Sequence, residues 1–183
     1  MHIRQHQAVE IENTSGLIRA ARSLCDGKLI DRYSIKHPDI RYGSIDLIPK
    51  NDQFLKFSIY LEDASNGTAI HFGGDKVKIH YANGNTHEIK GTLTSTYVQF
   101  PVGQPLSEKK MDTVQVPFEK SFIFLKVGPN KKESLLFEAL IPKENIDFEM
   151  EIPELRIGKD ILTPKVLKFQ WSDRWTVTPL NGC

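Results

Sequence analysis

The segment richest in side chains suited to binding lies near the C-terminus. It contains Phe169, Trp171, Asp173, Arg174 and Trp175 within seven positions. Trp and Arg are over-represented among the residues that dominate protein interfaces, and an exposed Trp can also stack on a sugar ring. Strand-type alternation breaks down here, which is typical of a bend or loop that turns side chains outward. We therefore predict a binding surface at Trp171, Asp173, Arg174 and Trp175; the alternative is that the aromatic residues belong to the core.

The two cysteines could form a disulfide that closes almost the whole chain. Cys25 lies near the start, and Cys183 is the last residue of the printed sequence. Such a bond would fasten the C-terminal end and is typical of proteins outside the cytoplasm. We expect this Cys25–Cys183 disulfide and a periplasmic or secreted protein; two free thiols are the alternative for the cysteines, and a cytoplasmic location is the alternative for the protein. The first seven residues contain no apolar segment of the kind found in a signal peptide.

Histidines suggest a metal site, because His80 and His87 flank a short turn. A two-residue turn at Asn83-Gly84 would bring the imidazoles opposite each other, as in half of a zinc site. It would also place charges on the apolar face of the hairpin. A three-residue loop, 83–85, instead puts His87 beside Ile79 and His80 on the polar face. We therefore expect no metal site.

Other signatures of catalysis are missing from the sequence. It contains no nucleophile elbow, zinc-protease motif or phosphate-binding loop. Gly73-Gly74-Asp75-Lys76 resembles a phosphate cradle only in composition, because it leads into a strand and not into a helix. We expect no cofactor and favour a protein that is not an enzyme.

An acidic row, Asp147, Glu149, Glu151 and Glu154, could meet a basic partner. The simpler interpretation is a solvated outer face of a strand, or protection of a sheet edge.

Most of these residues fall on segments with the spacing of β-strands. Eighteen isoleucines against seven alanines favour strands over helices. Apolar residues alternate cleanly at 55–62 and 146–152, and less regularly at 28–35, 40–48, 68–72, 76–81, 87–100, 114–118, 122–127, 135–141 and 166–171. Turn residues separate these runs. The pattern predicts a mainly β fold, an antiparallel β-sandwich of immunoglobulin-like or related Greek-key type.

One N-terminal helix is expected before the first strand. Residues 13–15 could cap it, Leu17, Ala21, Leu24 and Cys25 would share one face, and Gly27 would end it. This predicts an N-terminal segment and helix at 1–27 and a β-sandwich at 28–183, together one domain. The irregular stretch 101–112 is expected to be a long surface connection between the halves of the sandwich.

Composition narrows the classes of partner. The 183 residues carry 24 basic and 23 acidic side chains, which disfavours a broad nucleic-acid-binding surface. No run approaches the ~20 apolar residues of a membrane-spanning helix.

Three classes of function remain open. The first is a non-catalytic module that binds another protein, such as an inhibitor or toxin-neutralising immunity protein of the bacterial envelope. The second is a carbohydrate-binding module that uses Trp171, Trp175 and Tyr97. The third is an enzyme whose residues come from separate strands. The missing catalytic motifs favour the first.

Overall fold

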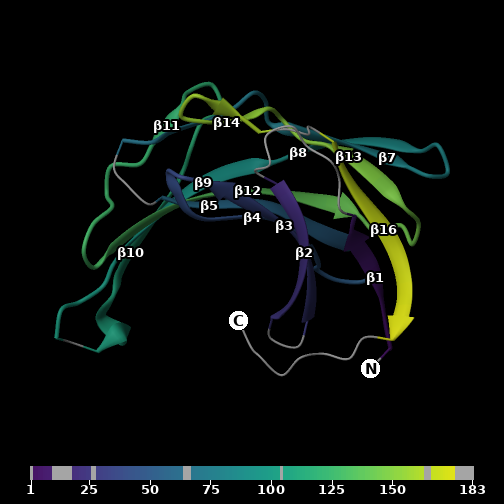
Figure 1. Cartoon of the computed structure of the whole chain (residues 1–183), viewed down its shortest axis with the longest axis horizontal. Helices are drawn as coiled ribbons and strands as arrows, with labels where there is room; N and C mark the ends of the chain where they lie inside the picture. Colours follow the sequence, from purple (N-terminus) through teal and green to yellow (C-terminus); the bar gives the residue numbers. More distant parts are fainter. Residues whose placement is uncertain are drawn as a thin grey trace.

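The chain folds into two layers of antiparallel β-sheet (Figure 1). The computed structural model describes residues 2–9, 18–25, 28–63, 67–103, 105–162 and 166–175, with the main chain alone at 2–7, 18–25, 28–31, 63, 106 and 172–175. A seven-stranded sheet forms one layer, and a five-stranded and a four-stranded sheet form the other. This confirms the predicted mainly β fold. Within the described residues, no helix has the length and apolarity needed to cross a membrane.

The seven-stranded sheet has the order β10-β9-β12-β5-β4-β3-β2. Its strands are β2 (Ile18–Cys25), β3 (Lys28–His37), β4 (Ile40–Pro49), β5 (Phe54–Asp63), β9 (Thr92–Gln99), β10 (Lys110–Gln115) and β12 (Lys131–Pro142). A short 3-10 helix, η1 (Leu106–Glu108), precedes β10.

The second layer combines the orders β1-β16-β13-β7-β8 and β11-β6-β14-β15. The five-stranded sheet contains β1 (His2–Ala8), β7 (Lys76–Tyr81), β8 (Thr86–Lys90), β13 (Phe148–Glu151) and β16 (Val166–Trp175). The four-stranded sheet contains β6 (Ala69–Phe72), β11 (Phe122–Ile123), β14 (Leu155–Ile157) and β15 (Asp160–Ile161).

Alternation along the strands builds the core between the layers. On β5, Leu55, Phe57, Ile59 and Leu61 are all buried. Aromatic rings join the layers: Phe72 of β6 stacks on Phe137 of β12 with ring centroids 5.6 Å apart. Burial of each large apolar side chain contributes roughly 1.5–3 kcal/mol.

A buried tyrosine ties the layers together with polar contacts. The hydroxyl of Tyr33, on β3, donates to the main-chain oxygen of Lys168 at 2.5 Å and accepts from the main-chain N–H of the same residue at 3.0 Å. Its ring meets Phe169 edge-to-face at 5.5 Å. The hydroxyl therefore fixes β16 over β3 while its ring stays in the core.

The predicted N-terminal helix is wrong. Residues 18–25 form strand β2, which pairs with β3 from Ile18 opposite Ile35 to Cys25 opposite Lys28. The predicted cap at 13–15, Leu17 and Gly27 lie outside the described residues. Pairing with β3 overrides the helical spacing of the apolar residues.

The β7–β8 hairpin has the predicted faces. Ile79 lies opposite His87, and His80 lies opposite Thr86. The imidazole of His87 contacts the ring of Tyr81, whereas His80 pairs with Glu151 at 2.7 Å. The closing residues are Tyr81 and Asn85, so the three-residue loop is 82–84, one position earlier than expected. Gly84 takes φ +91° there. The two histidines therefore point to opposite faces and cannot bind one ion together.

The stretch 101–112 does not join the two halves of the sandwich. It connects β9 to β10, which are neighbours in the seven-stranded sheet, and residues 110–112 already belong to β10. The predicted run 114–118 includes only the last two residues of this strand. The rest was missed because all six of its residues are exposed, which leaves no apolar face to detect.

Candidate functional site

The four residues predicted to bind all lie on β16. Trp171 to Trp175 pair with β1 without interruption, from Trp171 opposite His6 to Trp175 opposite His2. The expected break in the strand is therefore wrong, because pairing with β1 keeps residues 171–175 extended. The main-chain N–H of Trp171 also donates to Asp147 at 2.8 Å. A binding role for Trp171, Asp173, Arg174 and Trp175 stays a prediction.

The predicted disulfide cannot be placed in the fold. The main chain of Cys25 ends β2, and Cys183 lies outside the described residues. The Cys25–Cys183 bond stays a prediction.

Two residues of the acidic row contact basic side chains on neighbouring strands. Glu149 pairs with Lys168 at 3.2 Å, and Glu151 pairs with His80. Their strand, β13, is interior to its sheet, so the row does not protect an edge. Exposed pairs of this kind are ordinary on solvated strands.

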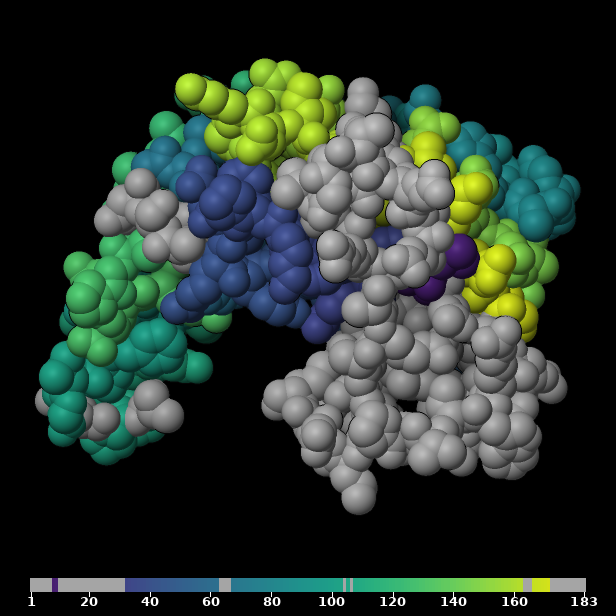
Figure 2. Space-filling model, in the orientation of Figure 1, coloured from purple at the N-terminus to yellow at the C-terminus, as the bar shows by residue number. Residues whose placement is uncertain are grey.

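A second polar surface lies on the face of the seven-stranded sheet that is turned away from the core, here called the concave face. Figure 2 shows the molecule hollowed beneath the residues of β4 and β5, beside the lobe that carries β10. The strand register brings side chains from four adjacent strands together here: Arg32, Tyr42, Asp46, Tyr60, Glu62 and Lys132.

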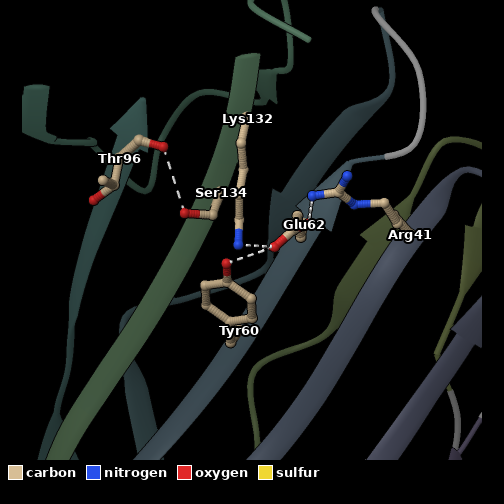
Figure 3. Close-up of polar contacts among 6 residues, drawn as sticks. All are labelled: Arg41, Tyr60, Glu62, Thr96, Lys132 and Ser134. Atoms are coloured by element: carbon tan, nitrogen blue, oxygen red, sulfur yellow. Dashed lines mark hydrogen bonds and ion pairs between the residues drawn. The ribbon is translucent and has the colours of Figure 1, made fainter. Parts of the chain in front are cut away.

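Glu62 is the centre of this surface and is only 5% exposed. Arg41 and Lys132 form ion pairs with its carboxylate, and the hydroxyl of Tyr60 donates to it at 2.9 Å (Figure 3). Nearby, the hydroxyl of Ser134 donates to the main-chain oxygen of Thr96 at 3.4 Å. Burial of a carboxylate is tolerated only when charges and hydrogen bonds compensate it, as they do here.

A β-bulge places Arg41 beside this carboxylate. Ile40 pairs with Asp63 and Tyr42 pairs with Glu62, so Arg41 is an extra residue in β4. Regular alternation would send Arg41 and Tyr42 to opposite faces of the sheet. The bulge redirects the strand, so that both Arg41 and Tyr42 reach Glu62 and its surroundings.

A second carboxylate, Asp46, is held in the same way. The guanidinium of Arg32 donates to both of its oxygens, at 2.6 and 3.2 Å, and the hydroxyl of Ser44 donates at 3.0 Å. Burial acts to lower the pKa of Arg32, but the hydrogen bond and the charge of Asp46 outweigh it and raise this pKa above its ordinary value. Two-point contact fixes the orientation of both side chains.

Two tyrosines lie between the cations. The rings of Tyr42 and Tyr60 have centroids 6.0 Å apart. Arg32 lies 5.8 Å from the ring of Tyr42, and Lys132 lies 5.9 Å from the ring of Tyr60. Each ring therefore contacts one cation and the other tyrosine, which holds the four side chains as one pre-arranged row.

A cavity of about 350 Å³ opens beside this row. Arg41 and Tyr42 line it together with Ser34 and His37. The imidazole of His37 is fixed, because its Nδ1 accepts from the main-chain N–H of Asp39 at 3.1 Å and its Nε2 lies 2.9 Å from a carboxylate oxygen of Asp160. Cavities of this size accommodate a small ligand or a side chain of a partner.

A larger cavity of about 960 Å³ includes Gly73 and Gly74. Its ionisable lining residues are His71, Asp75, Lys90 and Glu119. Among the described residues, these form one ion pair, between Asp75 and Lys90 at 3.2 Å. This set contains no nucleophile with an adjacent base, so the larger cavity supports catalysis less well than a constellation of oriented partners would.

Sequence patterns could not identify the concave site. Tyr60 and Glu62 stand at polar positions of an alternating strand, which are usually only solvated. Nothing in the sequence around Arg41 marks a bulge, and the partners of Glu62 come from separate strands. The alternation predicts that Tyr60 and Glu62 share one face of the sheet. It does not identify the neighbours that bury Glu62.

Comparison with known proteins identifies no relative, so a function can be inferred only from the fold and this site. No family model, no curated protein and no solved structure matches the chain.

Proposed function

We propose that this protein is a non-catalytic binding module and that it recognises another protein through the concave face. The observation that carries the proposal is the pairing of Arg41 and Tyr42 at the bulge. Tyr42 is 42% exposed and the side chain of Arg41 is 58% exposed, next to the 350 Å³ cavity. Tyr and Arg held in place by neighbours are the residue types that dominate protein interfaces.

Binding is favoured over catalysis because both carboxylates are already compensated. Glu62 has two cations and a hydroxyl, and Asp46 has a guanidinium and a hydroxyl. A general acid or base must exchange a proton with a substrate at low cost. The oxygens of both carboxylates already accept from several fixed donors, which leaves little access for a substrate and suits a fixed electrostatic surface.

A protein partner is favoured over a carbohydrate by the contacts of the aromatic rings. Tyr42 and Tyr60 each contact a cation and each other. Tyr97, considered as a sugar-stacking residue, has Lys126 5.0 Å from its ring centroid. Rings engaged in this way offer less free face to a sugar than to the mixed polar and apolar contacts of a protein interface.

The charge of the surface indicates the chemistry of the partner. Three cations, Arg32, Arg41 and Lys132, surround two carboxylates, Asp46 and Glu62, which leaves a local excess of one positive charge. We propose that the partner places an acidic side chain at Arg41. The more specific roles of inhibitor or toxin-neutralising protein in the bacterial envelope are part of this proposal, and they depend on the identity of the partner.

Photo-crosslinking tests the proposal. A photoreactive amino acid is placed in the full chain at position 42 or at position 97, and cross-linked proteins from the source cells are identified by mass spectrometry. Tyr97 is a matched control, because it also lies beside a cation but on the other face of the sheet. The proposal predicts one dominant product from position 42 and none from position 97. Equal products, or none from position 42, would contradict it.

Calorimetry with the purified partner then measures the contribution of each residue. Tyr42→Ala is expected to weaken affinity roughly 30-fold, as for a hot-spot residue, and Tyr97→Ala to leave it unchanged. The predicted role of β16 is measured alongside, with Arg174→Ala and Trp175→Ala. Loss of affinity at an unchanged melting temperature would support a surface role for those two residues.

A further inference from the structure

Strand β10 ends the seven-stranded sheet with an unpaired edge. It pairs with β9 on one side, and its hairpin with β9 projects from the body of the molecule (Figure 1). Among the described residues, no strand pairs with its other side. An unpaired edge is a template for another strand.

The main-chain groups on this free edge can be assigned from one hydrogen bond. The N–H of Val116 donates to the oxygen of Leu93, so Val116 points toward β9. The direction of the main-chain N–H and C=O groups alternates from one residue to the next along a strand. The groups of Met111, Thr113 and Gln115 therefore point away from β9. These groups form the edge that a further strand would meet.

Two of the usual protections of an edge, a bulge and a proline, are absent from β10, which carries two charged residues, Lys110 and Asp112. Its register with β9 is continuous, without a bulge, and it contains no proline. All six residues are exposed, including Met111 at 65% and Val114 at 51%, which project to opposite faces. Neither face of the strand is covered by a layer of the protein. Natural proteins commonly prevent edge pairing by one of these devices.

We propose that the occupant of this edge is β10 of a second copy of the chain, paired antiparallel about a two-fold axis at Met111. Residues directly opposite each other in a sheet share a face, whereas sequence neighbours lie on opposite faces. A two-fold axis perpendicular to the sheet must therefore pair one residue with the same residue of the other copy. With the axis at Met111, Lys110 of each copy lies opposite Asp112 of the other. The two methionines face each other between these pairs.

The charges of Lys110 and Asp112 favour this register over the registers centred on the next two residues. An axis at Asp112 would place two carboxylates opposite each other, which destabilises a cross-strand pair. An axis at Thr113 would place Asp112 opposite Val114 and leave both charges of each strand without an opposite partner. Only the axis at Met111 forms two Lys–Asp pairs and joins the main-chain groups of Met111 across the interface.

The resulting dimer would extend the concave face. The residues of β10 that share this face are Met111, Thr113 and Gln115, and the hydroxyl of Thr113 lies 3.0 Å from that of Thr96 on β9. Self-association through β10 would therefore leave Arg41 and Tyr42 free, so it does not depend on the function proposed above.

Charge reversal with rescue tests the dimer. The wild-type chain, Asp112→Lys, Lys110→Asp and the double variant are compared by sedimentation velocity over a wide range of protein concentration. Each single variant places like charges opposite each other twice and is expected to weaken the dimer by about tenfold or more. The double variant restores both pairs with reversed polarity and is expected to regain wild-type association.

A matched control is Lys78→Asp, an exposed lysine on the outer face of β7 that is remote from the proposed axis. Circular dichroism establishes that each variant is folded. A wild-type chain that stays monomeric at every concentration would overturn the proposal and leave the edge to a different protein. A dimer that is unaffected by the single variants, or that the double variant does not restore, would overturn the pairing at Met111.

Discussion

Carboxylates occupy two very different settings on the two outer faces of the sandwich. On the concave face, Glu62 and Asp46 are 5% and 7% exposed and have several charged or hydroxyl partners. On the outer face of the five-stranded sheet, the side chains of Glu149 and Glu151 are 51% and 47% exposed, and each contacts one basic side chain, Lys168 and His80 respectively.

Both sets stand at the polar positions of alternating strands, so alternation does not distinguish them. The difference comes from the neighbours. Tyrosines and a bulge enclose the concave carboxylates, whereas solvent screens the outer ones. An enclosed ion pair has a fixed geometry and is costly to break from one side, while an exposed pair contributes little. A polar strand face therefore becomes a specific surface only where curvature and bulky neighbours remove solvent.

The largest expected effect comes from removing the central carboxylate. Glu62→Ala leaves Arg41 and Lys132 facing each other and Tyr60 without its acceptor, so we expect the free energy of unfolding to fall by about 2–3 kcal/mol. The matched change Glu149→Ala is expected to shift it by less than about 0.5 kcal/mol. Urea denaturation of both variants checks this. Equal losses would show that the two faces do not differ.

Tyr81, a buried phenol, extends the comparison to a group that is neutral at pH 7. Burial, aided by the charge of Glu144, raises the pKa of Tyr81 to about 12. The folded chain therefore keeps this phenolic proton longer than the unfolded chain. The resulting stabilisation is complete below pH 10 and is lost as the pH rises to about 12.

The variant Tyr81→Phe tests whether ionisation of this phenol causes the loss of stability at alkaline pH. The variant loses the hydrogen bond from the hydroxyl to the main-chain oxygen of Pro142, at 2.6 Å, so stability at neutral pH should fall by about 1 kcal/mol. Its further decline between pH 10 and 12 should be smaller than that of the wild type. Thermal melts at several pH values measure both effects. An identical alkaline decline in the two proteins would refute the assignment to Tyr81.

The smallest effect is expected at an exposed pair. The hydrogen bond and charge of Lys76 lower the pKa of Glu88, and the carboxylate of Glu88 raises the pKa of Lys76. The contribution of Glu88 to stability is therefore present above its ordinary pKa and is lost as the pH falls through the lowered value.

Lys76→Met should return the pKa of Glu88 toward its ordinary value without a measurable change in melting temperature at neutral pH. Titration of the carboxyl signal by nuclear magnetic resonance measures the pKa, and added salt should reduce the wild-type shift. A loss of stability as large as that of Glu62→Ala would mean that exposure does not weaken these pairs.

The sequence predicted those parts of the fold that depend on alternation. The faces of β5, with Leu55 to Leu61 inward, and the opposite orientation of His80 and His87 follow from local pattern alone. The local pattern does not predict strand β1, which falls in the expected N-terminal segment 1–27. Strand β2 and most of β10 also escaped detection, because one has helical spacing and the other has no buried face. Their structure is set by pairing with β3 and β9, which a local pattern does not contain.

The candidate site depends even more on long-range contacts. Lys132 is 70 positions from Glu62 along the chain, and the bulge at Arg41 exists only relative to the partner strand β5. The segment from Trp171 to Trp175, which sequence composition favoured, forms a regular strand with β1. Composition therefore found suitable residue types but could not show which of them the fold gathers.

Hydroxyl-radical footprinting of the free chain and of its complex with the cross-linked partner tests the central claim most directly. The method reports solvent access to aromatic side chains one by one. If the concave face is the binding surface, Tyr42 and Tyr60 become protected in the complex while Tyr97, on the other face of the same sheet, keeps its reactivity. Protection of Tyr97 or of Trp171 with no change at Tyr42 would contradict the account and move the binding surface away from the concave face.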